Sequence, residues 1–285
     1  MVWSIMVQEF LAKKLKNPTQ QSMAAQKIEA DGEKHISLRK LIPNVLTILA
    51  LCLGLTSIRL GLDARFEGAV MAIVAAAFLD ALDGRVARFL RAESKIGAQL
   101  DSLVDFLNFG IAPVLLLYIW AMEDMGRLGW LAMLAYTVCA ALRLARFNVH
   151  SRDPDRPVWA DNFFIGMPSP AAGNLALAPL MLSFTGIIEV KNYLFIVGLY
   201  IIVLAGMMIS TIPTFSPKRL VLSVTRKQAM PLLLGIGVIA GGFFTFPWFG
   251  LLLLGSIYFL TMPLVIFYYY KLKRQSEATT PNIDG

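Results

Sequence analysis

We predict an all-α fold for this chain of 285 residues: a multi-span transmembrane helical bundle of about eight spans, with both termini cytoplasmic. Three observations lead to this prediction. The chain is 57% hydrophobic and only 16% charged, whereas soluble domains are about one quarter charged. Its mean hydropathy is +0.64. Several apolar runs reach the roughly 20 residues that a helix needs to cross a bilayer.

The apolar runs place the expected spans in order along the chain, at about 41–62, 67–88, 97–121, 128–147, 164–186, 192–212, 229–246 and 248–270. Residues 1–40 form a basic cytoplasmic tail, which is either an amphipathic helix on the membrane surface or a frayed extension. Residues 41–225 form a membrane core of six spans, and 226–270 add two C-terminal spans. The polar residues 271–285 are expected to be a disordered tail.

The cations predict the orientation of these spans. If the N-terminus is cytoplasmic, only four of the 26 Lys and Arg residues fall on the outer side: Arg59, Arg65, Arg127 and Lys191. Such a bias is typical of membrane topology. The net charge of +7 therefore reflects insertion into a membrane, and we expect no nucleic-acid partner.

Four aspartates lie where two of these spans meet, in the stretch DALDGRVARFLRAESKIGAQLDSLVD. Asp80 and Asp83 are three residues apart near the inner end of one span. Asp101 and Asp105 are four apart near the start of the next. Residues at these spacings share one face of a helix, so two neighbouring helices can turn all four carboxylates toward each other.

Such a cluster is unfavourable without a partner. An aspartate at the bilayer centre costs about 2.5–3.5 kcal/mol on insertion scales, and less near the interface. Protons would relieve the repulsion, but divalent cations relieve it better because they bind carboxylate oxygens well. The plainer interpretation is a loop of solvated aspartates, which the paired helical spacing disfavours. Next to the acids, Gly84 opens space beside the backbone, and the planar guanidinium of Arg88 suits a phosphate.

The same stretch resembles the signature of the CDP-alcohol phosphatidyltransferase family, D-x2-D-G-x2-A-R-x8-G-x3-D-x3-D. Every fixed position and spacing matches, at Asp80, Asp83, Gly84, Ala87, Arg88, Gly97, Asp101 and Asp105. The family's first span often opens with Pro-Asn-x-x-Thr near the cytidine. PNVLT matches it at Pro43, Asn44 and Thr47, although these residues alone would be an ordinary helix start.

The resemblance implies the role of each residue. Asp80, Asp83 and Asp101 bind two divalent metals, either Mg²⁺ or Mn²⁺. Asp105 contacts a metal and also acts as the catalytic base. The CDP-lipid is bound by Pro43, Asn44, Thr47, Gly84, Arg88 and Ser94. The enzyme would be a homodimer in the cytoplasmic membrane, with its active site on the cytoplasmic side.

Three further stretches bear on the acceptor alcohol: RLARFN (143–148), FIGMPSPAAG (164–173) and STIPTFSPKR (210–219). Together they are similar to the bacterial phosphatidylserine synthases of the family, and the resemblance covers roughly residues 40–225. It implies transfer of the phosphatidyl group from CDP-diacylglycerol to L-serine, with release of CMP. Arg143 and Arg146 either bind the serine carboxylate or extend to the interface and lipid headgroups.

Other functions stay open at this point. Within the family the acceptor alternatives are glycerol phosphate, inositol phosphate and choline, because the aspartate signature is common to all. A membrane prenyltransferase also uses aspartates and magnesium, but its second acidic motif should lie far along the chain. A metal or ion transporter would need charged groups near the midplane of several spans, and the later spans carry almost none.

Overall fold

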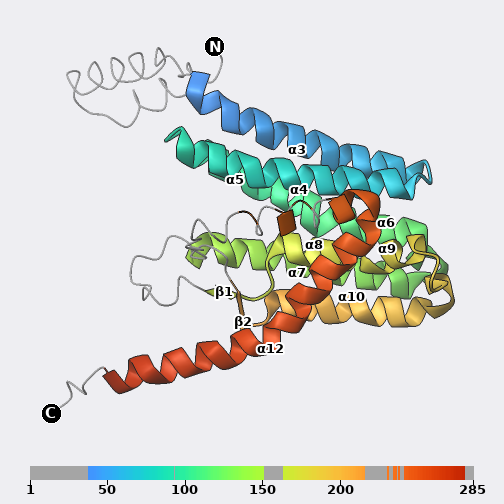
Figure 1. Cartoon of the computed structure of the whole chain (residues 1–285). Helices are drawn as coiled ribbons and strands as arrows, with labels where there is room; N and C mark the ends of the chain where they lie inside the picture. The colour runs from blue at the N-terminus through green and yellow to red at the C-terminus, as the bar shows by residue number, and fades with distance from the viewer. Residues whose placement is uncertain are drawn as a thin grey trace, which may run out of the picture.

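The computed structural model describes residues 38–92, 94–150, 163–215, 230, 234–235, 237 and 241–279. Most of these residues are helical (Figure 1). The predicted N-terminal amphipathic helix, residues 229, 231–233, 236 and 238–240 of the predicted span 229–246, and the last six residues lie outside the described residues.

The elements follow one another along the chain. The helices are α3 (Leu38–Leu62), α4 (Phe66–Phe89), α5 (Lys95–Asp105), the π-helix η1 (Phe106–Ile111), α6 (Ala112–Trp120), the 3-10 helix η2 (Met122–Met125), α7 (Arg127–His150), α8 (Ser169–Ala176), α9 (Ala178–Phe184), the 3-10 helix η4 (Val190–Tyr193), α10 (Leu194–Ile209) and α12 (Pro247–Thr279). Two short strands, β1 (Phe163–Ile165) and β2 (Pro213–Phe215), complete them.

Five stretches of helix are long and apolar enough to cross a membrane: Leu41–Leu62, Ile96–Trp120, Arg127–Val149, Val190–Ile209 and Pro247–Lys271. They correspond to five of the eight expected spans. The expected span 67–88 is the long helix α4, which is not among the five because it carries more charged residues: the first acidic pair, Glu67 and arginines. The expected span 164–186 is broken into α8 and α9, because Pro179 in the first turn of α9 lacks the N–H that a continuous helix requires.

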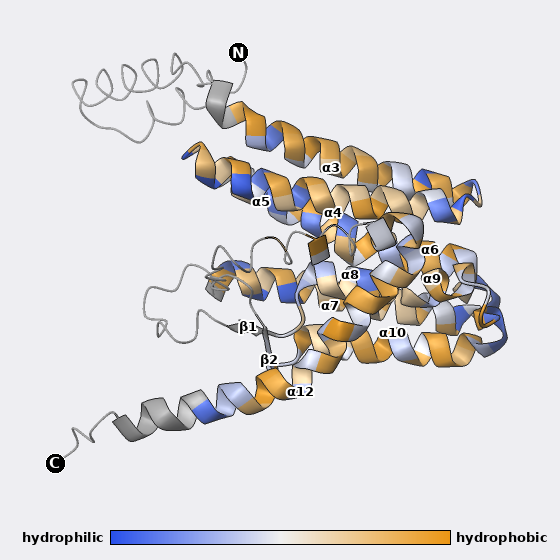
Figure 2. Cartoon of the chain, viewed as in Figure 1, coloured by the Kyte–Doolittle hydropathy of each residue, from blue (hydrophilic) through white to orange (hydrophobic). Residues whose placement is uncertain are grey.

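The helices bury small and bulky apolar residues against each other and expose other apolar residues outward. Hydrophobic residues predominate along the helices in Figure 2, and hydrophilic residues gather mainly at helix ends and along α4 and α5. Ile48, Leu49 and Leu55 of α3 are exposed, whereas Leu116 and Leu117 of α6 are fully buried. An apolar surface on all sides is typical of helices that lie in lipid.

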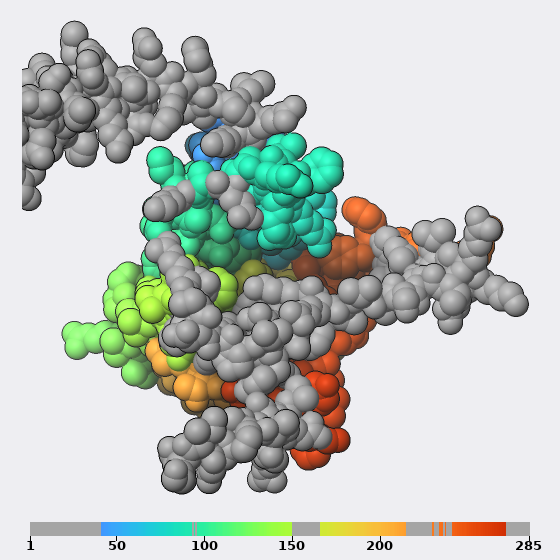
Figure 3. Space-filling model, turned by 90° about the vertical axis from the view of Figure 1, so that its left-hand side faces the viewer, coloured from blue at the N-terminus to red at the C-terminus, as the bar shows by residue number. Residues whose placement is uncertain are grey.

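Helix α3 and helix α4 pack along each other, and their connection lies at one end of the bundle (Figure 1). The connection between α4 and α5 lies at the opposite end. Figure 3 views that end, where blue-green residues of this region and yellow-green residues of α7 reach the surface. The acidic pairs of α4 and α5 therefore belong to the end of the bundle where α7 finishes.

The third span contains a π-helix that the sequence analysis did not predict. Pro113 has no backbone N–H to donate to the carbonyl of Phe109, four residues earlier. The hydroxyl of Tyr136 on α7 donates to this carbonyl instead, at 3.0 Å, and Thr137 donates to the carbonyl of Gly110 at 3.4 Å. Backbone groups released inside a membrane need such partners. The π-helix begins directly after Asp105, so it sets where that carboxylate lies.

The all-α prediction is wrong in one detail, because β1 and β2 form a small antiparallel sheet. Phe164 pairs with Thr214, and Ile165 pairs with Pro213. The sheet continues at Gly166, whose N–H donates to the carbonyl of Ile212 at 2.9 Å. The Thr214 hydroxyl donates to the Gly166 carbonyl at 2.8 Å. Gly166 has φ +78°, a conformation that glycine adopts without strain.

The last helix, α12, crosses the bundle diagonally and packs against α8, α9 and β2 (Figure 1). The Asn174 side chain of α8 donates to the carbonyl of Leu251 at 3.1 Å. The rings of Phe184 and Trp248 lie 4.7 Å apart. Helix α12 also continues to Thr279, so the expected disordered tail is helical from 271 to 279. Lys, Leu, Arg, Gln, Glu and Ala, which dominate this segment, are good helix formers.

One close approach in the first span yields a stability prediction. A methyl group on Gly54 would overlap the side chain of Asn108, which is fully buried and donates to the carbonyl of Ala50 at 3.3 Å. Gly54→Ala should therefore destabilise the bundle by about 1–3 kcal/mol through overpacking. Gly206→Ala is the matched control, since nothing lies within 4 Å of its added methyl. Thermal unfolding in detergent should show a lower Tm for Gly54→Ala only; equal Tm values for the two variants would contradict this packing.

Candidate active site and metal centre

The carboxylates of the two helices come together as their spacing predicts. Oxygen atoms of Asp80 and Asp83 on α4 and of Asp101 on α5 all lie within 4.8 Å of one another. The turn between the helices is short, and Arg91 adopts a positive φ of 49° within it. Asp105, one turn further along α5, is outside this group of three. It is close enough to Asp80 for the two charges to interact.

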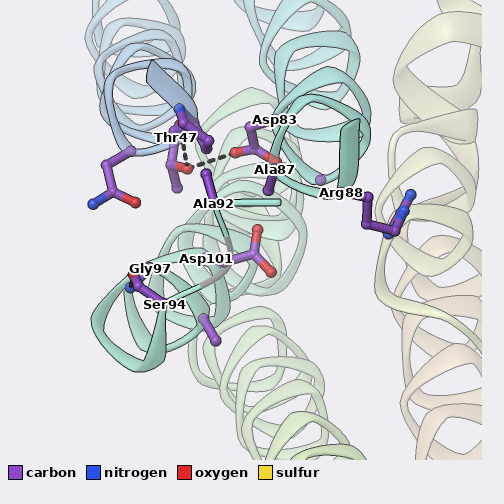
Figure 4. Close-up of a pocket in the computed structure, with 12 residues that line it drawn as sticks. Thr47, Asp83, Ala87, Arg88, Ala92, Ser94, Gly97 and Asp101 are labelled. Atoms are coloured by element: carbon purple, nitrogen blue, oxygen red, sulfur yellow. Dashed lines mark hydrogen bonds between the residues drawn. The ribbon is translucent and has the colours of Figure 1, made fainter. Parts of the chain in front are cut away.

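A threonine from the first span orients one of these acids. The hydroxyl of Thr47 on α3 donates to Oδ2 of Asp83 at 2.6 Å, as the dashed line in Figure 4 shows. Both residues are buried, with 3% of their surface exposed. Thr47 is the threonine of the PNVLT element, so this element contacts the acidic cluster directly. A hydrogen bond of this kind holds a carboxylate in one orientation, as around bound metals.

The cluster suits a divalent cation by its donor set and by its unsatisfied oxygens. Oδ1 of Asp80 and Oδ1 of Asp105 are buried, and no nitrogen or hydroxyl group of the described residues donates a hydrogen bond to either oxygen. Buried polar atoms in proteins are nearly always satisfied, so such atoms indicate a bound ligand. Carboxylate oxygens on opposite sides of one Mg²⁺ ion would be about 4.2 Å apart. The oxygens of the three aspartates lie within 4.8 Å of one another, a separation that a cation between them can bridge, so these residues fit a divalent metal.

A pocket of about 220 Å³ opens beside the cluster, between α3, α4 and α5. All six residues predicted to bind the CDP-lipid line it, and Asp83 and Asp101 form part of its wall. In Figure 4 the labelled residues surround this pocket, with the Arg88 side chain extending away from Asp83 and Asp101. The lining residues are Pro43, Asn44, Thr47, Asp83, Gly84, Ala87, Arg88, Ala92, Ser94, Gly97, Ala98 and Asp101.

The first turn of α5 is built for close contact with α3. Ser94 caps the helix, with its Oγ accepting a hydrogen bond from the N–H of Gly97 at 2.9 Å. A methyl group on Gly97 would lie 2.8 Å from Oδ1 of Asn44 and 2.9 Å from Oγ of Ser94. Only glycine therefore fits between the cap and Asn44, and Ser94 has a structural role besides its place in the pocket wall.

The two arginines proposed for serine lie apart from the pocket. Arg143 on α7 is buried, donates through Nη1 to the hydroxyl of Ser169, and stacks over the ring of Phe147 with 5.4 Å to its centroid. Its charge also interacts with Asp105. Arg143 therefore links the C-terminal part of α7 to α8 and to the acidic cluster.

Arg146 holds the end of α10. Its Nη1 donates to the carbonyl of Ile209 at 2.7 Å, and its Nη2 donates to the carbonyl of Ser210 at 3.0 Å. The last carbonyls of a helix lack partners within the helix, and a cation there satisfies them and opposes the helix dipole. These contacts support a structural role for Arg146.

The structure adds residues to the site that the sequence analysis missed. Ser169 contacts Arg143, and Ser102 is hydrogen-bonded to Asn148 beside Asp105. Asn148 ends the RLARFN stretch, which was singled out only through its arginines. The spacing between Ser102 and Asp105 could have placed Ser102 in the site, because residues three apart share a helix face. The pairing between α5 and α7 depends on tertiary structure and had no signal in the sequence.

The hydrogen bond from Thr47 to Asp83 yields a prediction about the affinity of the site for a divalent metal. Removing the hydroxyl in Thr47→Val frees the Asp83 carboxylate to rotate, and we expect the affinity for Mg²⁺ or Mn²⁺ to fall by about tenfold or more. A metal that binds only the folded protein raises its Tm, so the shift in Tm with metal concentration measures this affinity without turnover. Thr56→Val on the same helix is the control, because that exposed hydroxyl donates only to the carbonyl of Cys52. Indistinguishable titrations for the two variants would refute the role of Thr47.

The chain matches known proteins over its membrane core. A sequence model described as CDP-alcohol phosphatidyltransferase matches residues 40–212. A protein of Mycobacterium bovis named CDP-diacylglycerol–serine O-phosphatidyltransferase is 46% identical over 140 residues, which cover 49% of this chain and 48% of the relative. The chain thus spans about half the length of this relative.

Proteins with the same name in other bacteria are also similar. One from Helicobacter pylori is 38% identical over 142 residues, covering 50% of this chain and 58% of the relative. One from Bacillus subtilis is 39% identical over 145 residues, covering 50% and 76% respectively. The family match takes in α3 to α10, the elements that build the acidic cluster and its pocket. The chain belongs to the CDP-alcohol phosphatidyltransferase family.

Proposed function

We propose that this protein is a phosphatidylserine synthase, which converts CDP-diacylglycerol and L-serine into phosphatidylserine and CMP. The observation that carries the proposal is the group of three carboxylates beside a pocket that all six predicted CDP-lipid residues line. Two of the three, Asp83 and Asp101, form part of the pocket wall. The names of the bacterial relatives support serine as the acceptor.

The pocket residues bind and orient the nucleotide end of the lipid. Pro43 and Asn44 lie in the second turn of α3, and Asn44, beside Gly97, offers a polar amide to the cytidine. Gly84 leaves the backbone of α4 open to the diphosphate, and Arg88 supplies a guanidinium that pairs with phosphate oxygens. The acyl chains extend into the bilayer next to the exposed apolar faces of the helices.

Asp80, Asp83 and Asp101 hold the divalent metal, Mg²⁺ or Mn²⁺, with Thr47 fixing the orientation of Asp83. When bound, a pair of such ions supplies positive charge that stabilises the oxygens of a phosphoryl group during displacement. Two ions per site follow from the family resemblance. Asp105, beside the cluster and electrostatically coupled to Arg143, is the base.

Asp105 takes the proton of the serine hydroxyl, and the serine oxygen attacks the phosphorus that carries the diacylglycerol. A new P–O bond to serine forms as the P–O bond to CMP breaks, so CMP leaves with the bridging oxygen and its negative charge. This single displacement needs no protein nucleophile.

We also propose the membrane placement. Helix α4 packs along the membrane-capable α3 and is of similar length, which supports α4 as a further span. The acidic cluster then lies on the cytoplasmic side of the cytoplasmic membrane, where serine and CMP are soluble reactants. The same proposal includes the homodimer, the count of eight spans, and the boundaries of the basic tail and of the two C-terminal spans.

The acceptor is tested by supplying the purified protein with CDP-diacylglycerol, a divalent metal and one alcohol at a time. We expect CMP release with L-serine, and none above background with glycerol phosphate, inositol phosphate or choline. Release of CMP with glycerol phosphate but not with serine would show that the acceptor is wrong while the family chemistry stands.

The base is tested by Asp105→Asn. An amide cannot take the hydroxyl proton, and loss of a general base typically lowers the rate by about 10²–10⁴-fold. We expect kcat to fall by this factor while CDP binding and Tm change little. Asp124→Asn, an exposed carboxylate in η2, should retain full activity. Near-normal turnover in Asp105→Asn, or loss of CDP binding as its only defect, would contradict the role as base.

A further inference from the structure

A second pocket, of about 210 Å³, lies on the other side of α5, between this helix and the end of α7. Asp101 is in the wall of both pockets, whereas Asp105 lines only the second. The second pocket is formed mainly by Asp101, Ser102 and Asp105 of α5 and by Leu144, Phe147 and Asn148 of α7. It thus meets the first pocket at the acidic cluster.

Asn148 and Ser102 form a polar pair in the wall of this pocket. Nδ2 of Asn148 donates to Oγ of Ser102 at 3.1 Å, and Oγ of Ser102 lies 3.1 Å from the carbonyl of Ala98, to which it donates. Oδ1 of Asn148 also lies 3.3 Å from Oγ of Ser102. These contacts hold the amide, which carries both a donor and an acceptor, against the hydroxyl. Ser102 and Asp105 are three residues apart, so they share a face of α5.

The chemistry of the proposed transfer distributes the substrates between the two pockets. In a phosphoryl displacement the attacking and leaving oxygens lie roughly in line, on opposite sides of the phosphorus. The first pocket carries the residues predicted for the nucleotide, which is the leaving group. The attacking alcohol must then approach from the side of Asp105, and the second pocket is the space on that side.

The charge of the second pocket selects among alcohols. Its described lining contains two carboxylates and no Lys or Arg, and Arg143 donates to Ser169 outside the lining. A phosphate-bearing acceptor without an ammonium group would bring net negative charge against Asp101 and Asp105, whereas zwitterionic serine can turn its ammonium group toward them and its carboxylate away. An ammonium group is attracted there, and uncharged donors and acceptors are supplied by the Asn148–Ser102 pair.

We infer that the second pocket binds the acceptor as an amino alcohol and that the Asn148–Ser102 pair determines its specificity by hydrogen-bonding it beside Asp105. This inference rests on the proposed function, and it adds the residues and the pocket that choose the alcohol. The pair also links α5 to α7, so its test must separate acceptor binding from helix packing.

The experiment compares Asn148→Ala and Ser102→Ala with Asn174→Ala. Asn174 also joins two helices through one side-chain hydrogen bond, but it contacts α12 and lines neither pocket. We expect the KM for serine to rise about tenfold in both pocket variants, as for the loss of one hydrogen bond to a charged group. The KM for CDP-diacylglycerol should stay within about twofold of wild type, and Ser102→Thr, which keeps the hydroxyl, should retain the wild-type KM for serine.

A competition arm tests the charge argument with the wild-type protein. Serinol, an amino alcohol without a carboxylate, should inhibit serine turnover competitively, and glycerol phosphate at the same concentration should not. Two results would overturn the inference. One is an unchanged KM for serine in Asn148→Ala and Ser102→Ala. The other is a rise in the KM for serine and the KM for CDP-diacylglycerol together, with the same loss of Tm as in Asn174→Ala. Wild-type protein that uses glycerol phosphate instead of serine would overturn the proposed function itself, so the two failures are distinguishable.

Discussion

The architecture depends on one electrostatic constraint: four carboxylates lie together in an otherwise apolar helix bundle. Like charges at this distance repel, and removing them from water adds to the cost. The protein compensates only in part, with the Thr47 hydroxyl on Asp83 and the charge of Arg143 near Asp105. Two carboxylate oxygens remain buried without a partner among the described residues. A bound cation would balance the remaining negative charge. This explains why the chain carries four aspartates in a region where insertion into a membrane disfavours them.

The rest of the bundle holds this unfavourable site in place. Pro113 forces the π-helix after Asp105, and Tyr136 supplies the donor that the proline removes. Arg146 satisfies the last carbonyls of α10, next to the small sheet. Helix α12 packs on α8, α9 and β2, so the last span supports the later elements of the bundle. Backbone carbonyls near the site that lack a partner within their own helix thus accept hydrogen bonds from specific side chains, as a lipid environment requires.

Much of the site was predictable, because it depends on helix periodicity. The three- and four-residue spacings of Asp80, Asp83, Asp101 and Asp105 predicted a shared face. The PNVLT element was expected near the cytidine from the family resemblance alone. The π-helix, the β1–β2 sheet and the break between α8 and α9 were not predicted, since hydropathy reports burial and not the local path of the backbone. The contacts of Arg143 and Arg146 and the second pocket arise from residues far apart in sequence, which no spacing along one helix reveals.

The most direct measurement of the central claim is an anomalous-diffraction map of crystals grown with Mn²⁺ and CDP. The account predicts Mn²⁺ density coordinated by Asp80, Asp83 and Asp101, with the diphosphate of CDP on the side of Thr47 and Gly84. Density at another place in the molecule, or an ordered CDP in that pocket with no metal beside the three carboxylates, would contradict it.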